Sequence, residues 1–269
     1  MNANSHNDVA AGPNIVRVRH ESATRRLLTV RRVEKLSSTM LRVTLGGDQL
    51  EGFTSLGFDD HVKLIFDPSI AGKVGSFFSG KPPMRDFTPR RFDAVARELV
   101  IDFAIHEAGV ATAWATSAKP GQSLNVGGPR GSFIIPPDIG CHLLIGDDTA
   151  LPAIGRRLEE LPAGTRAIVV AEIDTEAQQL AFTSEAAVDI RWVYRRGAHA
   201  GTPDAILEAL RLVSLPARDI FVWAAAESKV ARAVRHYLVT ERHVDKQWIK
   251  AAGYWQRGSV GEHEKITDD

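Results

Sequence analysis

Short stretches of alternating apolar and polar residues fill the chain between residues 27 and 136. Successive side chains of a β-strand point to opposite faces, so this alternation predicts half-buried strands. Turns rich in glycine and proline separate the stretches, and little helix is expected among them. Six or seven short strands joined in this way indicate a small antiparallel barrel. The expected strands are 27–36, 39–47, 61–67, 98–105, 123–126 and 132–135.

After Pro136 and Pro137 the pattern changes to apolar runs that alternate with amphipathic helical segments. Such alternation predicts a parallel sheet covered by helices, because parallel strands need a crossover connection. The first helix is expected to be capped by Asp148. The expected strands are 141–147, 165–173, 189–195 and 218–226, and the expected helices are 147–164, 202–213 and 227–242.

The change of pattern near residues 137–140 predicts two domains, and 269 residues allow each domain to bury its own core. We expect the barrel to occupy residues 25–137 and the α/β domain, with a C-terminal segment, to occupy residues 138–269. Residues 1–24 lack the order of a signal peptide. Arginines crowd near the start of the chain, at Arg17, Arg19, Arg25, Arg26, Arg31 and Arg32. Residues 1–24 are expected to form a disordered basic arm.

Composition limits the function classes. Lys and Arg together number 33, as do Asp and Glu, so no overall field attracts nucleic acid or a membrane. No apolar run reaches 18 residues, so no transmembrane helix is expected. The single cysteine, Cys141, cannot form an internal disulfide, which fits a reducing cytoplasm. The nine histidines lack metal-binding spacing, which predicts that the chain holds no metal tightly.

The stretch from Arg85 to Arg90 carries the most specific chemistry. Its prolines disfavour a helix, and an extended strand end would place Arg85 and Phe87 on one face. Arg85 offers a planar fork of donors for phosphate, Phe87 a flat face for stacking, and Thr88 a hydroxyl for a heterocycle edge. Together these groups suit a flavin nucleotide. The alternative is an edge strand whose charges only meet solvent.

This stretch, MRDFTPRRFD, is similar to the Arg-x-(Tyr/Phe)-(Thr/Ser) flavin motif of the ferredoxin-reductase superfamily. Within that superfamily it looks most like the siderophore-interacting proteins, which are FAD-dependent ferric-siderophore reductases. Phe87 stands where tyrosine is commoner. The resemblance runs from roughly Leu27 to Gly258 and includes five segments in the family's order, which is more specific than any single motif.

A second segment of the resemblance lies about 20 residues after Arg85. Here Gly109 is followed by a short helix of small residues over 110–118, whose backbone N–H groups can meet a pyrophosphate. Taken alone, His106 reads as a strand-end histidine in water, and Trp114 as a packing residue. The resemblance implies cofactor contacts at Asp86, Asp102, His106, Gly109, Val110, Ala111, Thr112 and Trp114, in addition to Arg85, Phe87 and Thr88.

Two cations are implicated in substrate binding by the resemblance. Lys63 lies between buried positions of a strand and therefore points away from the core. Arg130 projects from the turn GGPRGSF, which resembles the superfamily's Gly-Pro-x-Gly-x-Phe turn. The resemblance places both at the mouth of the flavin site, where they would attract an anionic ferric chelate. The alternative for Lys63 is an ordinary solvated lysine.

The turn 146–150 follows the first strand of the α/β domain, where such sheets offer N–H groups to a dinucleotide. No Gly-x-Gly-x-x-Gly fingerprint is present, and two acids would repel phosphate. We expect the acids to cap the helix, leaving Thr149 to offer its hydroxyl and Ala150 its backbone donor. The segment from Asp147 resembles the family's nicotinamide segment, which adds Asp147 to the expected contacts. Glu172 favours NADH, whereas Arg195 and Arg196 favour NADPH, so the donor stays open.

The resemblance implies a flavin reductase that passes electrons from NADPH or NADH through FAD to ferric siderophores, releasing Fe(II). No side chain is expected to act as a catalytic acid, base or nucleophile. One alternative is a flavin reductase that serves a ferredoxin or an oxygenase, and another is a non-catalytic, flavin-bearing protein that binds chelates. We expect a cytoplasmic protein that is a monomer or a weak dimer and that neither binds nucleic acid nor inserts into a membrane.

Overall fold

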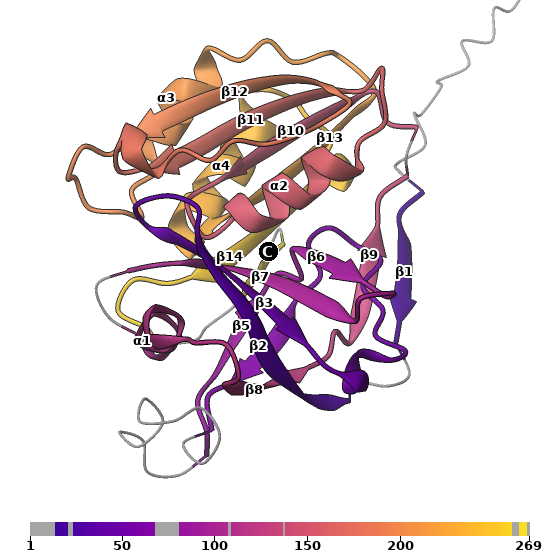
Figure 1. Cartoon of the computed structure of the whole chain (residues 1–269). Helices are drawn as coiled ribbons and strands as arrows, with labels where there is room; N and C mark the ends of the chain where they lie inside the picture. Colours follow the sequence, from indigo (N-terminus) through magenta and orange to yellow (C-terminus); the bar gives the residue numbers. More distant parts are fainter. Residues whose placement is uncertain are drawn as a thin grey trace, which may run out of the picture.

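An antiparallel barrel and a mostly parallel sheet form the two halves of the chain (Figure 1). The computed structural model describes residues 14–20, 24–67, 81–106, 109–136, 138–259 and 264–267. Both halves agree with the architecture predicted from the periodicity of the sequence. Among the described residues, no helix is long and apolar enough to cross a membrane.

The barrel sheet has seven strands in the order β5-β4-β8-β2-β3-β7-β6. Its inner face is apolar at every second position, and the short helix α1 (Val110–Ser117) closes one end. A separate two-stranded sheet pairs β1 (Val16–Arg19) with β9 (Gly131–Ile134). The barrel strands are β2 (Arg25–Lys35), β3 (Met40–Gly46), β4 (Val62–Ile65), β5 (Met84–Phe87), β6 (Arg91–Asp93), β7 (Glu98–Ala104) and β8 (Ser123–Gly127).

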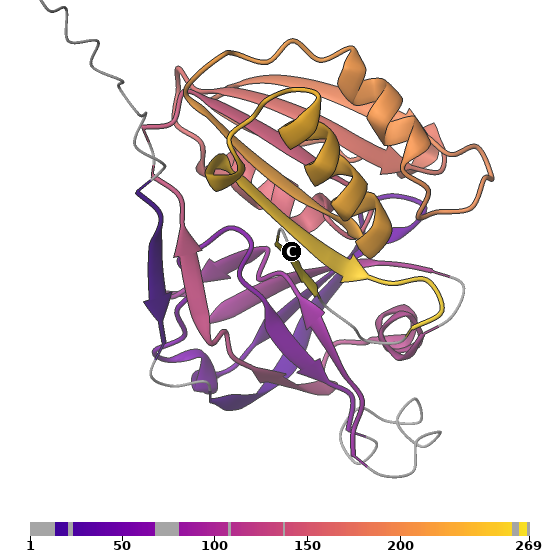
Figure 2. The ribbon, with the colours of Figure 1, turned by 180° about the vertical axis from the view of Figure 1, so that it is seen from behind.

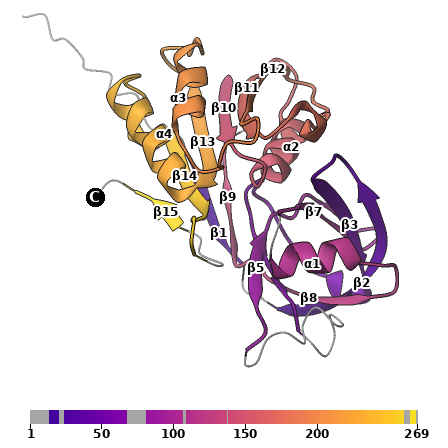
Figure 3. The same cartoon turned by 90° about the vertical axis from the view of Figure 1, so that its left-hand side faces the viewer.

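The second sheet has six strands in the order β12-β11-β10-β13-β14-β15, all parallel except β15. Helix α2 lies between this sheet and the barrel, whereas α3 and α4 cover the outer face (Figures 2 and 3). The strands are β10 (Cys141–Gly146), β11 (Arg166–Ile173), β12 (Ala187–Tyr194), β13 (Ile220–Glu227), β14 (Ile249–Trp255) and β15 (Glu264–Ile266). The helices are α2 (Leu151–Glu160), α3 (Asp204–Arg211) and α4 (Ser228–Thr240), with short 3-10 turns at Asp48–Leu50, Glu176–Gln178 and Lys246–Trp248.

Apolar side chains on the inner face of the α/β sheet join the two halves. Leu144 on β10 and Ile154 on α2 belong to the same buried cluster as Met40 and Phe58 from the barrel. Burial of a large apolar side chain contributes roughly 1.5–3 kcal/mol, so this shared core holds the halves together. The inner face of the α/β sheet is therefore fixed relative to the barrel strands.

Three local features differ from the expectations. Residues Val16–Arg19, within the stretch expected to be a disordered arm, pair with β9; the rest of that arm at 1–13 and 21–23, and Pro137 at the expected domain boundary, lie outside the described residues. Strands β6, β14 and β15 were not predicted. Helix α2 begins at Leu151 rather than 147, and Asp148 does not cap it, because its carboxylate pairs with Arg195 instead.

Candidate functional site

Arg85 lies on β5, opposite Leu64 of β4, and keeps most of its donors free. Its guanidinium donates one hydrogen bond to the carbonyl of Met84, at 2.8 Å. Among the described residues, no carboxylate lies within ion-pair distance of it. Burial lowers the pKa of Arg85, which is the direction expected for a partly desolvated cation without a counter-charge. Its remaining donors can therefore pair with an anion, and a phosphate oxygen matches their geometry.

Phe87 and Thr88 continue from Arg85 towards the junction of the two halves. The half-buried ring of Phe87 packs against Phe103, with ring centroids 4.5 Å apart. Thr88 is buried and shares a side-chain hydrogen bond with Tyr254, which comes from β14 of the α/β half. The end of the motif strand thus meets a strand of the other half.

Asp86 and Lys63 face each other across β4 and β5. The Lys63 Nζ atom lies 2.8 and 3.0 Å from the two oxygens of Asp86. Lys63 is therefore not the free cation that the sequence suggested, because Asp86 balances its charge. Arg130 is exposed in the turn between β8 and β9, as expected.

Asp102 belongs to a buried charge cluster. Its carboxylate accepts two hydrogen bonds from Arg42, at 2.7 and 2.8 Å, and lies 3.7 Å from Arg90 Nε. The side chain is only 2% exposed. Arginines of the barrel thus contact both of its oxygens. Asp102 therefore stabilises the barrel and does not offer a free acceptor to a ligand.

The segment around α1 reaches across to the α/β half. Gly109 precedes the helix with φ of 146°, a backbone conformation that side chains disfavour. The backbone N–H of His106 donates to the Thr112 hydroxyl at 3.3 Å, and His106 Nε2 lies 3.9 Å from Asp148. Val110 is buried and Ala111 and Thr112 are partly exposed at the start of this helix.

Trp114 is a packing residue, in agreement with its interpretation from the sequence alone. It is 1% exposed, and its ring lies between Phe66 and Phe103 at centroid distances of 6.1 and 5.6 Å. Its indole nitrogen has no hydrogen-bond partner within the described part of the chain. The side chain supports α1 against the barrel core.

The turn after β10 is organised by Asp147. This buried carboxylate accepts hydrogen bonds from the Thr149 amide (2.9 Å) and hydroxyl (2.5 Å), the Trp255 indole (2.7 Å) and the Glu227 amide (3.2 Å). Burial, and next the charge of Asp148, raise the pKa of Asp147. One side chain thereby ties the ends of β10, β13 and β14 together. Because the Thr149 hydroxyl donates to Asp147, it is not offered outward as the sequence suggested.

The turn also needs its first residue to be glycine. A Cβ on Gly146 would lie 2.3 Å from the Ala150 Cβ and 2.6 Å from the Ala225 carbonyl oxygen. Ala150 is fully buried beneath the start of α2, and its backbone N–H donates to the Asp147 carbonyl at 3.0 Å, so it is not the free backbone donor that the sequence suggested. The strand end and helix start are therefore held in close contact, which leaves the backbone N–H groups of the turn in a fixed arrangement.

Glu172 and Arg195 form a second buried contact at this edge. Arg195 lies 3.2 Å from Glu172 and 3.3 Å from Asp148. Glu172 is 3% exposed, and burial raises its pKa to about 7 although Arg195 opposes the shift. Its carboxylate is thus committed to Arg195, whereas Arg196 is exposed. The simple rule that an acid here binds a ribose does not apply to this side chain.

Two neighbouring acids before β4 make contacts that were not predicted from the sequence. Asp59 accepts a hydrogen bond from the Trp223 indole at 3.0 Å and pairs with Lys250 at 2.6 Å, both from the α/β half. Asp60 instead accepts bonds from Ser55 and Ser132 within the barrel. Two adjacent acids before a buried strand are the only local signal, and that signal does not indicate a partner more than 150 residues away.

Comparisons with known proteins agree with this arrangement. The family described as "Siderophore-interacting FAD-binding domain" matches residues 29–133, and the family described as "Siderophore-interacting protein" matches residues 140–258. An NADPH-dependent ferric-chelate reductase of Escherichia coli is 37% identical over 251 residues, covering 89% of this chain and 95% of the relative. The ferric vibriobactin reductase ViuB of Vibrio cholerae is 30% identical over 254 residues, covering 89% and 93%. The crystal structure of a siderophore utilization protein from T. fusca superposes with a TM-score of 0.82 at 36% identity, covering 92% and 98%.

Proposed function

The chain belongs to the siderophore-interacting protein family, and from that premise we propose that it is an FAD-dependent reductase that passes electrons from NAD(P)H to ferric siderophores. The observation that carries the proposal is the guanidinium of Arg85, which has no acid partner among the described residues and lies beside Phe87 and Thr88 at the strand end that meets the α/β half. One NAD(P)H supplies two electrons and so reduces two ferric ions to Fe(II). Fe(II) is held less strongly by oxygen-rich chelates, which releases the metal.

The donor set of the barrel fits FAD. Arg85 would hold a phosphate, the start of α1 after Gly109 would offer backbone N–H groups, and Thr88 would meet the ring edge. When bound, FAD supplies the conversion of a two-electron hydride into single-electron transfers. The chain's own part is to orient the rings and exclude water, and no side chain is assigned as acid, base or nucleophile.

We propose that the dinucleotide binds at the turn 146–150, which the contacts of Asp147 hold in place. The commitment of Glu172 to Arg195 removes the acid that would favour NADH, and the exposed Arg196 is a cation available to a 2′-phosphate. The E. coli relative is named as NADPH-dependent. NADPH is therefore the proposed donor.

Arg130 and Lys63 are the proposed substrate-binding cations. Arg130 is exposed, and Lys63 keeps 42% of its side chain accessible while paired with Asp86. The neutralised pair contributes less to attraction than a free lysine does, so Arg130 supplies most of the positive charge. An anionic ferric chelate is the matching substrate.

Anaerobic reduction tests the function. The purified protein, loaded with FAD, is mixed with NADPH or NADH, and several ferric chelates are then added with an Fe(II)-trapping dye. Bleaching of the flavin followed by chelate-dependent Fe(II) formation supports the proposal. Bleaching without Fe(II) formation would indicate a reductase for a ferredoxin or an oxygenase, and the absence of bleaching would indicate a binding protein without turnover.

Domain bounds, oligomeric state and cellular location are proposed as well. We propose an FAD domain over 25–137 and a nicotinamide domain over 138–269, supported by family matches that end at 133 and begin at 140. A cytoplasmic monomer or weak dimer without nucleic-acid binding is proposed from the balanced charge and the single cysteine. Light scattering at several concentrations tests the oligomeric state.

A further inference from the structure

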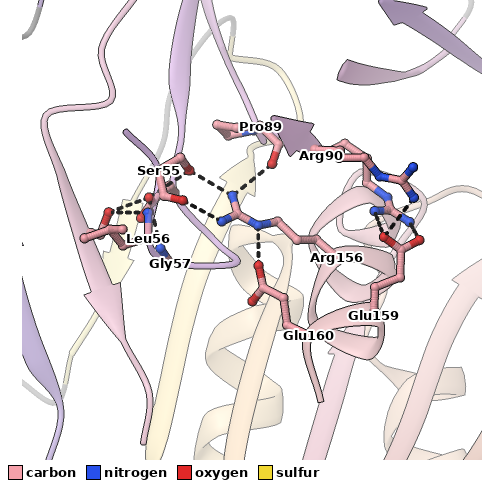
Figure 4. Close-up of polar contacts among 11 residues, drawn as sticks. Ser55, Leu56, Gly57, Pro89, Arg90, Arg156, Glu159 and Glu160 are labelled. Carbon is pink, nitrogen blue, oxygen red and sulfur yellow. Dashed lines mark hydrogen bonds and ion pairs between the residues drawn. The ribbon is translucent and has the colours of Figure 1, made fainter. Parts of the chain in front are cut away.

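Three consecutive barrel residues, Thr88, Pro89 and Arg90, each bond to the α/β half. Thr88 shares its hydrogen bond with Tyr254, and the Pro89 carbonyl accepts one from Arg156 Nη1 at 2.9 Å. Arg90 pairs with Glu159 through contacts of 2.8 and 2.5 Å. Two of the three partners, Arg156 and Glu159, lie on α2 (Figure 4). Pro89 and Arg90, which follow the flavin motif, are thus both bonded to one helix of the other half.

Arg156 makes the more extensive of these contacts. Its Nη1 also donates to the Ser55 hydroxyl at 2.8 Å, and its Nη2 donates to the Ser55 carbonyl at 2.9 Å. Its Nε donates to Glu160, one turn along the same helix, at 2.7 Å. The side chain is only 11% exposed. A guanidinium fork can satisfy these acceptors at once, whereas an ammonium group cannot match the same geometry.

The second contact is enclosed on the barrel side. Arg90 is 6% exposed and also lies 3.7 Å from Asp102, so it links this buried carboxylate to Glu159, which is 25% exposed. The helix approaches closely at Gly155, where a Cβ would lie 3.1 Å from Arg90 Nη2 and 2.9 Å from the Phe182 ring. A larger residue there would crowd the Arg90–Glu159 ion pair.

The same helix starts directly after the turn 146–150, which is the proposed dinucleotide site. We infer that Arg156 and Glu159 are positioning residues for hydride transfer, because they connect that turn to the flavin segment through about two and a half turns of rigid helix. This inference rests on the proposed function. Hydride transfer needs the reacting atoms about 3–3.5 Å apart, and a misplacement of about 1 Å costs on the order of 100-fold in rate.

The test compares Arg156→Lys and Glu159→Gln with Glu208→Gln as the control. Glu208 is an exposed acid on α3, which covers the face of the sheet that points away from the barrel. In stopped-flow reduction of the FAD-loaded protein, we expect the limiting rate at saturating NADPH to fall about 10- to 100-fold in the first two variants. The dissociation constants for NADPH and FAD should stay within about threefold of wild type, and the control should keep the wild-type rate.

A second readout uses the apoprotein. Backbone amides of residues 84–93 should exchange with deuterium faster in Arg156→Lys and Glu159→Gln than in wild type, because these variants weaken the contacts between the segment and α2. Exchange of the same amides in Glu208→Gln should match wild type. A wild-type limiting rate in both variants would overturn the inference, as would a loss that excess FAD or NADPH restores. Failure of the proposed function is distinct: wild-type protein that binds FAD would not be bleached by either nicotinamide.

Discussion

Replacing Arg85 by alanine should weaken FAD binding without destabilising the apoprotein. Among the described residues, the side chain of Arg85 bonds to the neighbouring carbonyl of Met84, and no acid pairs with it. Removing the guanidinium therefore breaks little that holds the barrel together. Its loss should be felt only when an anionic ligand occupies the site.

The magnitude follows from the contact that is lost. A hydrogen bond to a charged group is worth about 1.5–3 kcal/mol, and Arg85 can make one or two such bonds to a phosphate. The dissociation constant for FAD should rise about 10- to 150-fold in Arg85→Ala. Arg85→Lys should fall between the two proteins, since the charge remains and the planar fork is lost.

Titration of the apoprotein with FAD, followed by quenching of flavin fluorescence, measures the change. Arg32→Ala is the matched control, because Arg32 is a barrel arginine that already pairs with Glu98 at 2.7 Å and is half exposed. The control should bind FAD like wild type. If Arg85→Ala binds FAD within twofold of wild type, Arg85 does not hold a phosphate.

Three further predictions concern charge. Burial, and next the charge of Arg157, lower the pKa of His142 to about 3. The free energy of unfolding should therefore fall as pH drops from 6.5, by about 5 kcal/mol at most. Urea titrations measure this: the unfolding free energies of wild type and His142→Phe should diverge below pH 6.5, and parallel curves would contradict the prediction. Glu172 has a raised pKa, so stability should fall by up to about 3 kcal/mol as pH rises from 4.5 to about 7, and Glu172→Gln should remove that fall. At low salt, Lys63→Ala should raise the KM for a strongly anionic ferric chelate, and Asp86→Asn should lower it. Both shifts in KM should shrink near 1 M salt, where the Debye length is about 3 Å. Shifts of the same sign in the two variants would exclude electrostatic attraction of the chelate by this pair.

Much of the fold followed from local periodicity, and the exceptions have a common physical cause. The strand at Val16–Arg19 is short, basic and mostly exposed, and it pairs only because the edge of β9 lies beside it. Strand β14 is added alongside β13, and its small residues give little alternation. Strand formation in both cases depends on a distant partner, which a local pattern does not contain.

The candidate site divides in the same way. The identity of Arg85 and Thr88 predicted a ligand class, because those groups carry recognisable chemistry. The partner of each charge did not follow from identity: Lys63 meets Asp86 only through the register of β4 and β5, and Asp148 turns to Arg195 instead of capping α2. These pairings decide which charges remain available to a ligand.

The residues between the two proposed ligand sites show the limit most clearly. The sequence RRLEE at 156–160 is indistinguishable from a solvated helical face, since arginine and glutamate are mostly exposed residues. In the structure, Arg156 is 11% exposed and Glu159 25% exposed, because the barrel covers that face of α2. Desolvation makes both contacts depend strongly on geometry, as an unpaired buried charge costs several kcal/mol. A motif can therefore specify what binds to each half. The distance between the two ligands depends instead on charged residues such as Arg156 and Glu159, which belong to no motif and whose partners are known only when the two halves are seen packed together.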